Sequence, residues 1–138
     1  MRNKILVIGC GRLGAAIANE SFTKGDNVLV MDADKGSFDR LSDVFSGYTI
    51  TADATDVNAL EDAGIDNVRT VVITTGNDNV NLFLAHVCDR IYHVPHVYVR
   101  FDDPDKGVLV KGYNIIPIYP FQLTHDKFLA LRNQEDKK

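Results

Sequence analysis

Three glycines near the N-terminus have the spacing of a phosphate-binding turn. Gly9, Gly11 and Gly14 follow an unbroken apolar run, Ile5 to Ile8, in the pattern Gly-x-Gly-x-x-Gly. The first glycine permits a tight turn, the second lets a pyrophosphate approach the backbone, and the third lets the following helix pack closely on the strand. Free N–H groups at the start of that helix attract phosphate oxygens. The spacing therefore predicts a nucleotide diphosphate site.

Two charged residues fit the two ends of such a ligand. Arg12 lies inside the turn, where its guanidinium could donate two hydrogen bonds to phosphate oxygens. The alternative is that Arg12 is a solvated arginine at the surface. Asp32 ends a second apolar run, Asn27 to Asp32, near the offset at which a carboxylate receives ribose hydroxyls. A carboxylate there repels a 2′-phosphate, which disfavours NADP. The alternative for Asp32 is an ordinary aspartate at a turn.

Other polar residues follow the later strands of the chain. They are Asp53, Ala54 and Thr55 after the third strand, Thr75, Gly76 and Asn77 after the fourth, and Arg100 at the end of the fifth. We expect Asp53 and Ala54 near the adenine edge, with Thr55 or Asp56 capping the next helix, although an ordinary helix cap would explain the whole group equally well. Gly76 and Asn77 would border the second half of the ligand. Arg100 would meet phosphate or a neighbouring subunit.

The elements that must hold these residues alternate between strand and helix six times. Apolar runs predict strands at residues 5–8, 27–32, 48–51, 70–74, 95–100 and 114–118. Such alternation with short connections is typical of an α/β, Rossmann-type doubly wound fold, with a parallel six-stranded sheet in the order 3-2-1-4-5-6. Because ligands bind at the carboxyl ends of the strands in such sheets, all the residues above are expected at one edge.

Helices are expected between and after these strands. One follows the glycine turn and stops at Lys24 to Asp26, and a second, capped by Asp34, carries apolar side chains as far as Phe45. Further helices are predicted at residues 57–63, 79–91 and from 104, and a last one at residues 120–132. Phe121, Phe128 and Leu131 give this last helix an apolar stripe, for which an interaction role and packing on its own sheet are equally plausible.

Composition limits the classes of function. The 138 residues are 45% hydrophobic and 25% charged, which is typical of one globular domain, here residues 1–132 with a frayed polar tail at 133–138. The net charge of −4 argues against nucleic acid as a partner. We expect no signal peptide and no membrane helix, and two cysteines that do not form a disulfide framework favour a reducing cytoplasm.

The residues that could catalyse a reaction are not assembled into a catalytic set. Cys10 has no adjacent base, and His93 and His96 have no carboxylate or cysteine nearby to complete a metal site. A dehydrogenase usually builds its substrate pocket from a second domain. We therefore expect a nucleotide sensor and not an enzyme. The alternatives are a small NAD-dependent oxidoreductase, or a fragment of one, and a redox-responsive repressor subunit.

Taken together, the motifs resemble a known family. The matching segments are Gly9-Cys10-Gly11-Arg12-Leu13-Gly14, Val30 to Asp34, Asp53-Ala54-Thr55, Gly64-Ile65, Thr75 to Asn79 and Tyr98 to Arg100. In order and spacing they resemble the N-terminal domain of Trk/Ktr-type potassium-transport regulators, also called RCK or KTN domains, over about residues 3–120. The resemblance implies a cytoplasmic subunit at the inner face of the membrane that binds NAD(H) or ATP/ADP. Such subunits form homodimers or dimer-built rings beneath a membrane potassium channel or transporter and gate it.

The resemblance also implies roles for single residues. The turn from Gly9 to Gly14, including Cys10 and Leu13, would hold phosphates, with Arg12 on the terminal ones. Asp32 would take ribose, Ala33 and the Asp53-Ala54 pair would border adenine, and Thr75-Gly76 would lie along the ribose-phosphate side.

Two departures from the family pattern stand out. Many members have Pro-Glu where this chain has Pro120-Phe121, so a contribution of that acid to a ligand or ion is in doubt. The usual C-terminal regulatory domain is missing, which implies either a truncated chain or a single-domain form that acts with a second regulatory subunit.

Overall fold

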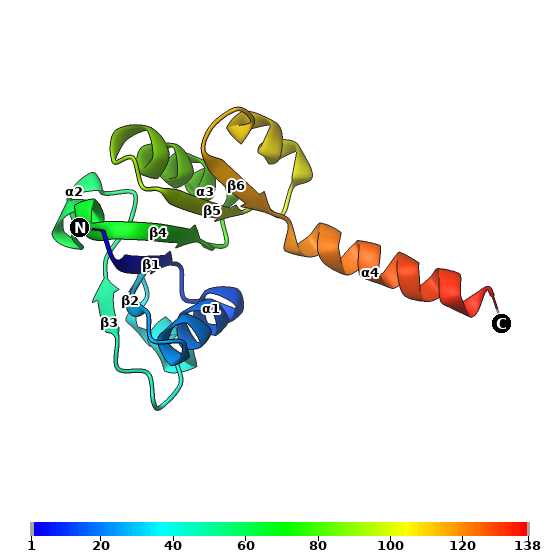
Figure 1. Ribbon diagram of the computed structural model, residues 1–138, viewed down its shortest axis with the longest axis horizontal. Helices are drawn as coiled ribbons and strands as arrows, with labels where there is room; N and C mark the ends of the chain where they lie inside the picture. The colour runs from blue at the N-terminus through cyan, green and yellow to red at the C-terminus, as the bar shows by residue number, and fades with distance from the viewer. Residues whose placement is uncertain (1, 138) are drawn as a thin grey trace.

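A computed structural model, which describes residues 2–137, confirms the α/β fold and its strand order (Figure 1). Six parallel strands form one sheet in the order β3-β2-β1-β4-β5-β6. The strands are β1 (Lys4–Ile8), β2 (Asn27–Asp32), β3 (Tyr48–Thr51), β4 (Val68–Ile73), β5 (His96–Arg100) and β6 (Ile115–Ile118). The chain crosses from β3 at one edge to β4 at the centre, which places the topological switch point between β1 and β4.

Helices pack on both faces of this sheet. The helices and helical turns of the chain are α1 (Arg12–Thr23), the 3-10 helix η1 (Lys35–Arg40), α2 (Val57–Asp62), the 3-10 turn η2 (Ile65–Asn67), α3 (Asp78–His86), the π-helical turn η3 (Val87–Ile91), the 3-10 helix η4 (Pro104–Val110) and α4 (Pro120–Glu135), of which α4 lies apart from the sheet. Side chains of α1 and η1 pack on one face of the sheet, and those of α2, α3, η3 and η4 pack on the other.

The centre of the sheet is apolar on both faces. Leu6, Val7 and Ile8 of β1 are at most 2% exposed, and because side chains alternate along a strand they serve both apolar layers. On α1 the buried residues facing the sheet are small, Ala15 and Ala18, so the helix approaches the strands closely. This agrees with the prediction of a first strand buried on both faces.

The second predicted helix is shorter than expected. Asp34 caps it as predicted, by accepting a hydrogen bond from the Gly36 N–H at 2.9 Å, but η1 ends at Arg40 instead of continuing to Phe45. Glycine, serine and aspartate are poor helix formers, and they occupy five of the eleven positions from Lys35 to Phe45. Phe45 still packs on the α1 face of the sheet, whereas Val44 is 73% exposed.

The last helix leaves the sheet and projects away from the rest of the domain (Figure 1). It has no buried residue, and Phe121, Phe128 and Leu131 are 68%, 57% and 52% exposed. The alternative that this helix packs on its own sheet is therefore wrong. The helix also continues to Glu135, so residues 133–135 of the expected tail are helical.

Within the described part of the chain, 2–137, no helix has both the length and the apolar composition required to cross a bilayer.

Candidate nucleotide-binding site

The three glycines of the turn differ in what surrounds them. Gly9 has a left-handed φ of 97°, and a Cβ there would lie 2.9 Å from the backbone of Thr74 and Thr75. A Cβ on Gly14 would overlap the carbonyl oxygen of Gly9. A Cβ on Gly11, in contrast, would meet nothing within 4 Å. The first and third glycines are therefore required by packing, and the second leaves the approach to the turn open.

The start of α1 offers unpaired donors beside this turn. Gly11 is the N-cap, and no side chain caps the helix, so the N–H groups of its first turn are available to an anion. Arg12 is exposed at the same end. Cys10 is fully buried beneath the turn, where burial and then the Asp32 carboxylate raise the pKa of its thiol above the ordinary value. Its side chain is thus a packing group, and only its backbone faces the site.

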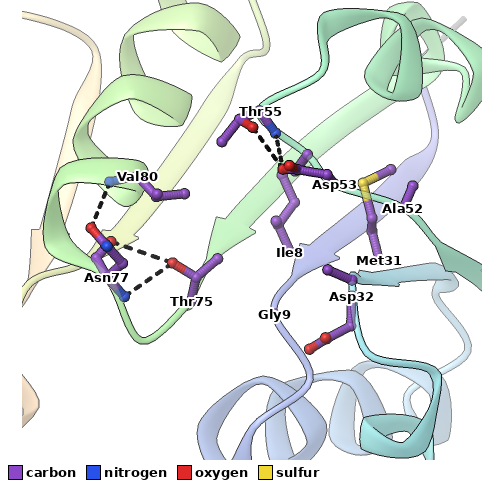
Figure 2. A pocket seen from close by; sticks show the side chains of 12 residues that line it. Ile8, Gly9, Met31, Asp32, Ala52, Asp53, Thr55, Thr75, Asn77 and Val80 are labelled. Atoms are coloured by element: carbon purple, nitrogen blue, oxygen red, sulfur yellow. Dashed lines mark hydrogen bonds between the residues drawn. The ribbon is translucent and has the colours of Figure 1, made fainter.

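The carboxylate of Asp32 is fixed at the end of β2 by two backbone groups. Its Oδ2 accepts a hydrogen bond from the Cys10 N–H at 2.7 Å, and its Oδ1 accepts one from the Asp34 N–H at 2.8 Å. Each carboxylate oxygen can accept a further hydrogen bond. Asp32 therefore joins the ends of β1 and β2 and is one of the residues that line the neighbouring cleft (Figure 2).

A cleft of about 330 Å³ opens at the switch point between the carboxyl ends of the strands (Figure 2). The predicted site residues that line it are Gly9, Asp32, Ala33, Asp53, Ala54, Thr55, Thr75 and Asn77. Four apolar residues that sequence reasoning did not select complete the wall, namely Ile8, Met31, Ala52 and Val80. The cleft thus combines an apolar wall with a few polar groups at its rim, which is typical of small-molecule sites.

Asp53 and Thr55 form a closed polar pair at the end of β3. Asp53 Oδ1 accepts hydrogen bonds from the Thr55 N–H at 2.9 Å and from the Thr55 hydroxyl at 2.7 Å (Figure 2). The hydroxyl bond, followed by the N–H bond, holds the pKa of Asp53 below its ordinary value, so this carboxylate stays ionised. Asp56 caps α2 by accepting from the Asn58 N–H at 3.0 Å. The cap therefore belongs to Asp56, and Asp53 and Thr55 remain on the cleft.

Across the cleft, the loop after β4 is ordered by its own side chains. Asn77 caps α3 by accepting a hydrogen bond from the N–H group of Asn79 at 2.9 Å and one from that of Val80 at 3.1 Å, the second of which is drawn in Figure 2. The hydroxyl of Thr75 bonds to the side chain of Asn81, a fully buried residue that sequence reasoning missed. A Cβ on Gly76 would meet nothing within 4 Å, so this position leaves the loop open to a ligand.

The remaining predicted residues do not line the cleft itself. Cys10 and Gly11 belong to the turn after β1, Gly76 belongs to the loop after β4, and Arg100 ends β5. Arg12, Leu13 and Gly14 form the first turn of α1. Arg100 forms an ion pair with Asp102 at 3.1 Å and borders a second cavity with Pro120, Phe121 and Thr124 at the base of α4. Its two predicted roles, at a phosphate or at a neighbouring subunit, remain predictions.

Arg40 is a second arginine near the glycine turn that sequence reasoning did not select. Its Nη1 lies 3.4 Å from the Cys10 carbonyl oxygen, a long hydrogen bond from η1 to the turn. Arg40 lies far from the glycine motif in sequence, after β2, and no motif fixes the number of residues between them. The sequence alone therefore gave no reason to place Arg40 at the turn. Among residues 2–137, no three His, Cys, Asp or Glu side chains gather as a metal site would require.

Comparison with known sequences identifies the family of this chain. The profile of the TrkA-N domain matches residues 5–116, which run from the second residue of β1 to the second residue of β6 and include every residue of the cleft. The chain belongs to the TrkA-N domain family. The match confirms that this TrkA-N domain belongs to the family that the sequence motifs resemble.

Named relatives of this TrkA-N domain belong to potassium uptake systems. The Trk system potassium uptake protein TrkA of Streptomyces coelicolor is 31% identical over 125 residues, which are 91% of this chain and 56% of that protein. A TrkA homolog of Methanothermobacter thermautotrophicus is 30% identical over 111 residues, which are 80% of this chain and 51% of that protein. The chain thus spans about half the length of these relatives.

Solved structures share the fold at lower identity. The GsuK channel bound to NAD superposes with a TM-score of 0.81 at 22% identity, covering 97% of this chain and 24% of that one. GsuK bound to ADP gives a TM-score of 0.81 at 22% identity, covering 96% of this chain and 34% of that one. At this identity the likeness establishes the Rossmann-like fold.

Proposed function

We propose that this TrkA-N domain is a nucleotide-binding regulatory module of a potassium channel or transporter, and that its ligand is NAD(H) or an adenine nucleotide such as ATP or ADP. The observation that carries the proposal is the Asp32 carboxylate, oriented by Cys10 and Asp34 at the rim of the cleft, next to a helix start with free N–H groups. Because the Cys10 N–H ties Asp32 to the glycine turn, a ribose on Asp32 and a diphosphate on the turn can belong to one nucleotide.

The apolar wall supports an adenine-containing ligand. Met31, Ala52, Ala54 and Val80 offer a surface for a flat base, and the ionised Asp53 at the edge can accept a hydrogen bond from an amino group. AMP is the part that all the candidate ligands share, and the two GsuK structures that share this fold are bound to NAD and to ADP.

A binding role fits the cleft better than oxidoreductase chemistry does. The side chains that line it in the described chain include no histidine, lysine, tyrosine or cysteine, and these are the usual proton donors beside a hydride acceptor. Its only titratable side chains are the carboxylates of Asp32 and Asp53, and the low pKa of Asp53 makes it a poor acid. We infer that the ligand acts by stabilising one conformation of the domain.

The partner is inferred from the named relatives and from α4. We propose that the module sits in the cytoplasm against the inner face of the membrane, held there by a potassium channel or transporter subunit, and gates it. The exposed Phe121, Phe128 and Leu131 make α4 a surface for a second copy in a homodimer or dimer-built ring, or for a second regulatory subunit.

Thermal unfolding of the purified protein with a nucleotide panel tests the ligand. A ligand present at 100 times its dissociation constant adds about 2.7 kcal/mol to the free energy of unfolding. We expect stabilisation by ADP, ATP, NAD or NADH, and little by NADP, because the Asp32 carboxylate repels a 2′-phosphate. Absence of stabilisation by every member of the panel would end the proposal.

A further inference from the structure

The side chain of Asn81 connects the loop after β4 to the end of the neighbouring strand β5. It is 0% exposed, so its amide must find all its hydrogen-bond partners inside the protein. Its Nδ2 donates to the Thr75 carbonyl oxygen at 3.0 Å and to the Arg100 carbonyl oxygen at 2.9 Å, and its Oδ1 accepts from the Thr75 hydroxyl. Both N–H donors and the oxygen are therefore in use, and they tie the wall of the cleft at Thr75 to the end of β5.

The peptide unit between Arg100 and Phe101 connects the Asn81 hydrogen bond to β6. The Arg100 carbonyl shares its rigid amide plane with the Phe101 N–H, which donates to the Ile118 carbonyl oxygen at 3.0 Å. Ile118 ends β6 and is followed directly by Tyr119, the N-cap of α4. The side chain of Phe101 is fully buried, so the peptide unit cannot turn freely.

A second contact binds the segment that follows β5 to α3. The Asp78 carboxylate accepts hydrogen bonds from the N–H groups of Asp102 and Asp103, each at 2.9 Å. The segment that follows β5 is thus bound to the first turn of α3, directly after the loop that borders the cleft. Since α4 has no buried residue, its connection through β6 and Tyr119 is its main attachment to the domain (Figure 1).

We propose that Asn81 is a positioning residue that couples occupancy of the cleft to the order of the first turn of α4. The inference rests on the proposed function, because it needs a nucleotide against Thr75. A ligand that restrains the loop after β4 restrains Asn81, and Asn81 restrains the Arg100–Phe101 peptide unit and with it the end of β6. The relay thus runs from the cleft to the element that presents the exposed apolar residues.

Residue-resolved hydrogen exchange of the whole chain, with and without ADP, tests the coupling. The reporting amides are Phe101, bonded to Ile118, and Leu123, bonded to the Tyr119 carbonyl oxygen at 3.0 Å. At ADP about 100 times its dissociation constant we expect both to exchange more slowly, by up to about 100-fold, because openings that release the ligand become rarer by that factor. Asp136, at the far end of α4, is the reference amide and should be unchanged.

Asn81→Asp separates the relay from ligand binding. It keeps the size of the side chain and removes both N–H donors to Thr75 and Arg100. Asn79→Asp makes the same chemical change at an exposed position of the same helix and is the matched control. We expect ADP to slow exchange in the loop at residues 75–77 in all three proteins, and to slow Phe101 and Leu123 only in the wild type and the control.

The outcomes separate this inference from the proposed function. If ADP slows exchange at residues 75–77 of the wild type and leaves Phe101 and Leu123 unchanged, the relay is overturned while nucleotide binding stands, and this result needs no variant to fold. Equal slowing of both amides in Asn81→Asp also overturns it. If ADP does not bind, the exchange is measured with whichever of ATP, NAD or NADH stabilises the wild type, and the same outcomes apply. If no member of that panel binds the wild type, the proposed function fails and the relay fails with it.

Discussion

The hydroxyl of Thr74 donates a hydrogen bond to the Gly9 carbonyl oxygen at 2.9 Å, in the space that a side chain on Gly14 would need. Thr74 is only 5% exposed and is the first residue after β4, so this bond joins the two strands that flank the switch point. The side of the glycine turn that faces β4 is therefore fixed by Thr74, and the side at Gly11 has free space beside it.

Replacing the third glycine should destabilise the fold. A Cβ in Gly14→Ala would overlap the Gly9 carbonyl and press on the Thr74 hydroxyl, so we expect the free energy of unfolding to fall by about 1–3 kcal/mol. Urea unfolding measures this change. Gly11→Ala is the matched control, since its Cβ meets nothing within 4 Å and its φ of −79° suits alanine. An equal loss in both variants would contradict the packing described for the turn.

The Asp53–Thr55 pair should be visible in a titration. The pKa of Asp53 lies below its ordinary value because Thr55 donates to the carboxylate, chiefly through its hydroxyl. With a lowered folded-state pKa, the pair favours the folded state above the ordinary pKa, and the contribution is lost as pH falls through the folded pKa. Thr55→Val should raise the pKa of Asp53 in carboxyl-detected NMR, and Thr49→Val, on the strand β3 that precedes the pair, should not. An unchanged Asp53 in Thr55→Val would refute the assigned cause.

Both thiols should be protected in the folded protein. Burial raises the pKa of Cys88 to about 12, and burial with the Asp32 charge raises that of Cys10. Because the thiolate is the reactive form, we expect a disulfide reagent near neutral pH to label neither cysteine until the protein is unfolded in denaturant. Rapid labelling of Cys10 in the native state would place its side chain in the open cleft instead of beneath the turn.

The exposed stripe on α4 should affect association and leave the fold unchanged. Phe128 is 57% exposed and α4 has no buried residue, so Phe128→Glu should change the free energy of unfolding of the monomer by no more than about 0.5 kcal/mol. The same variant should shift a concentration-dependent dimer toward monomer in analytical ultracentrifugation. Gln134→Glu, which adds the same charge off the stripe, is its control. Identical sedimentation of the wild type and Phe128→Glu would show that α4 is not part of the interface.

The sheet was predictable from sequence because each strand is marked by its own side chains. Apolar runs such as Ile5 to Ile8, buried on both faces, have few alternative structures, and the glycine spacing located the switch point directly. Asp32, Asp53 and Thr75 could be placed at the cleft for the same reason, since each one follows a strand end.

The parts that sequence reasoning missed depend on contacts between distant residues. An asparagine inside a helix gives no signal, and the position of Asn81 is informative only once Arg100 is known to lie 2.9 Å away. The direction of Arg100 is set by its pair with Asp102. The apolar stripe of α4 has the same pattern whether a helix packs on its sheet or leaves it, so only the structure decided between them.

Calorimetric titration of ADP into the wild-type protein and Asp32→Ala tests the central claim most directly. We predict that the wild type binds and that the variant binds more weakly by about 1–3 kcal/mol, because a charge-assisted hydrogen bond to ribose is lost. Asp39→Ala, at an exposed position of η1 outside the cleft, should bind as the wild type does. Both variants are first checked for folding, since Asp32→Ala also releases the N–H groups of Cys10 and Asp34. Equal affinity of the wild type and a folded Asp32→Ala would contradict the assignment of this cleft as the nucleotide site.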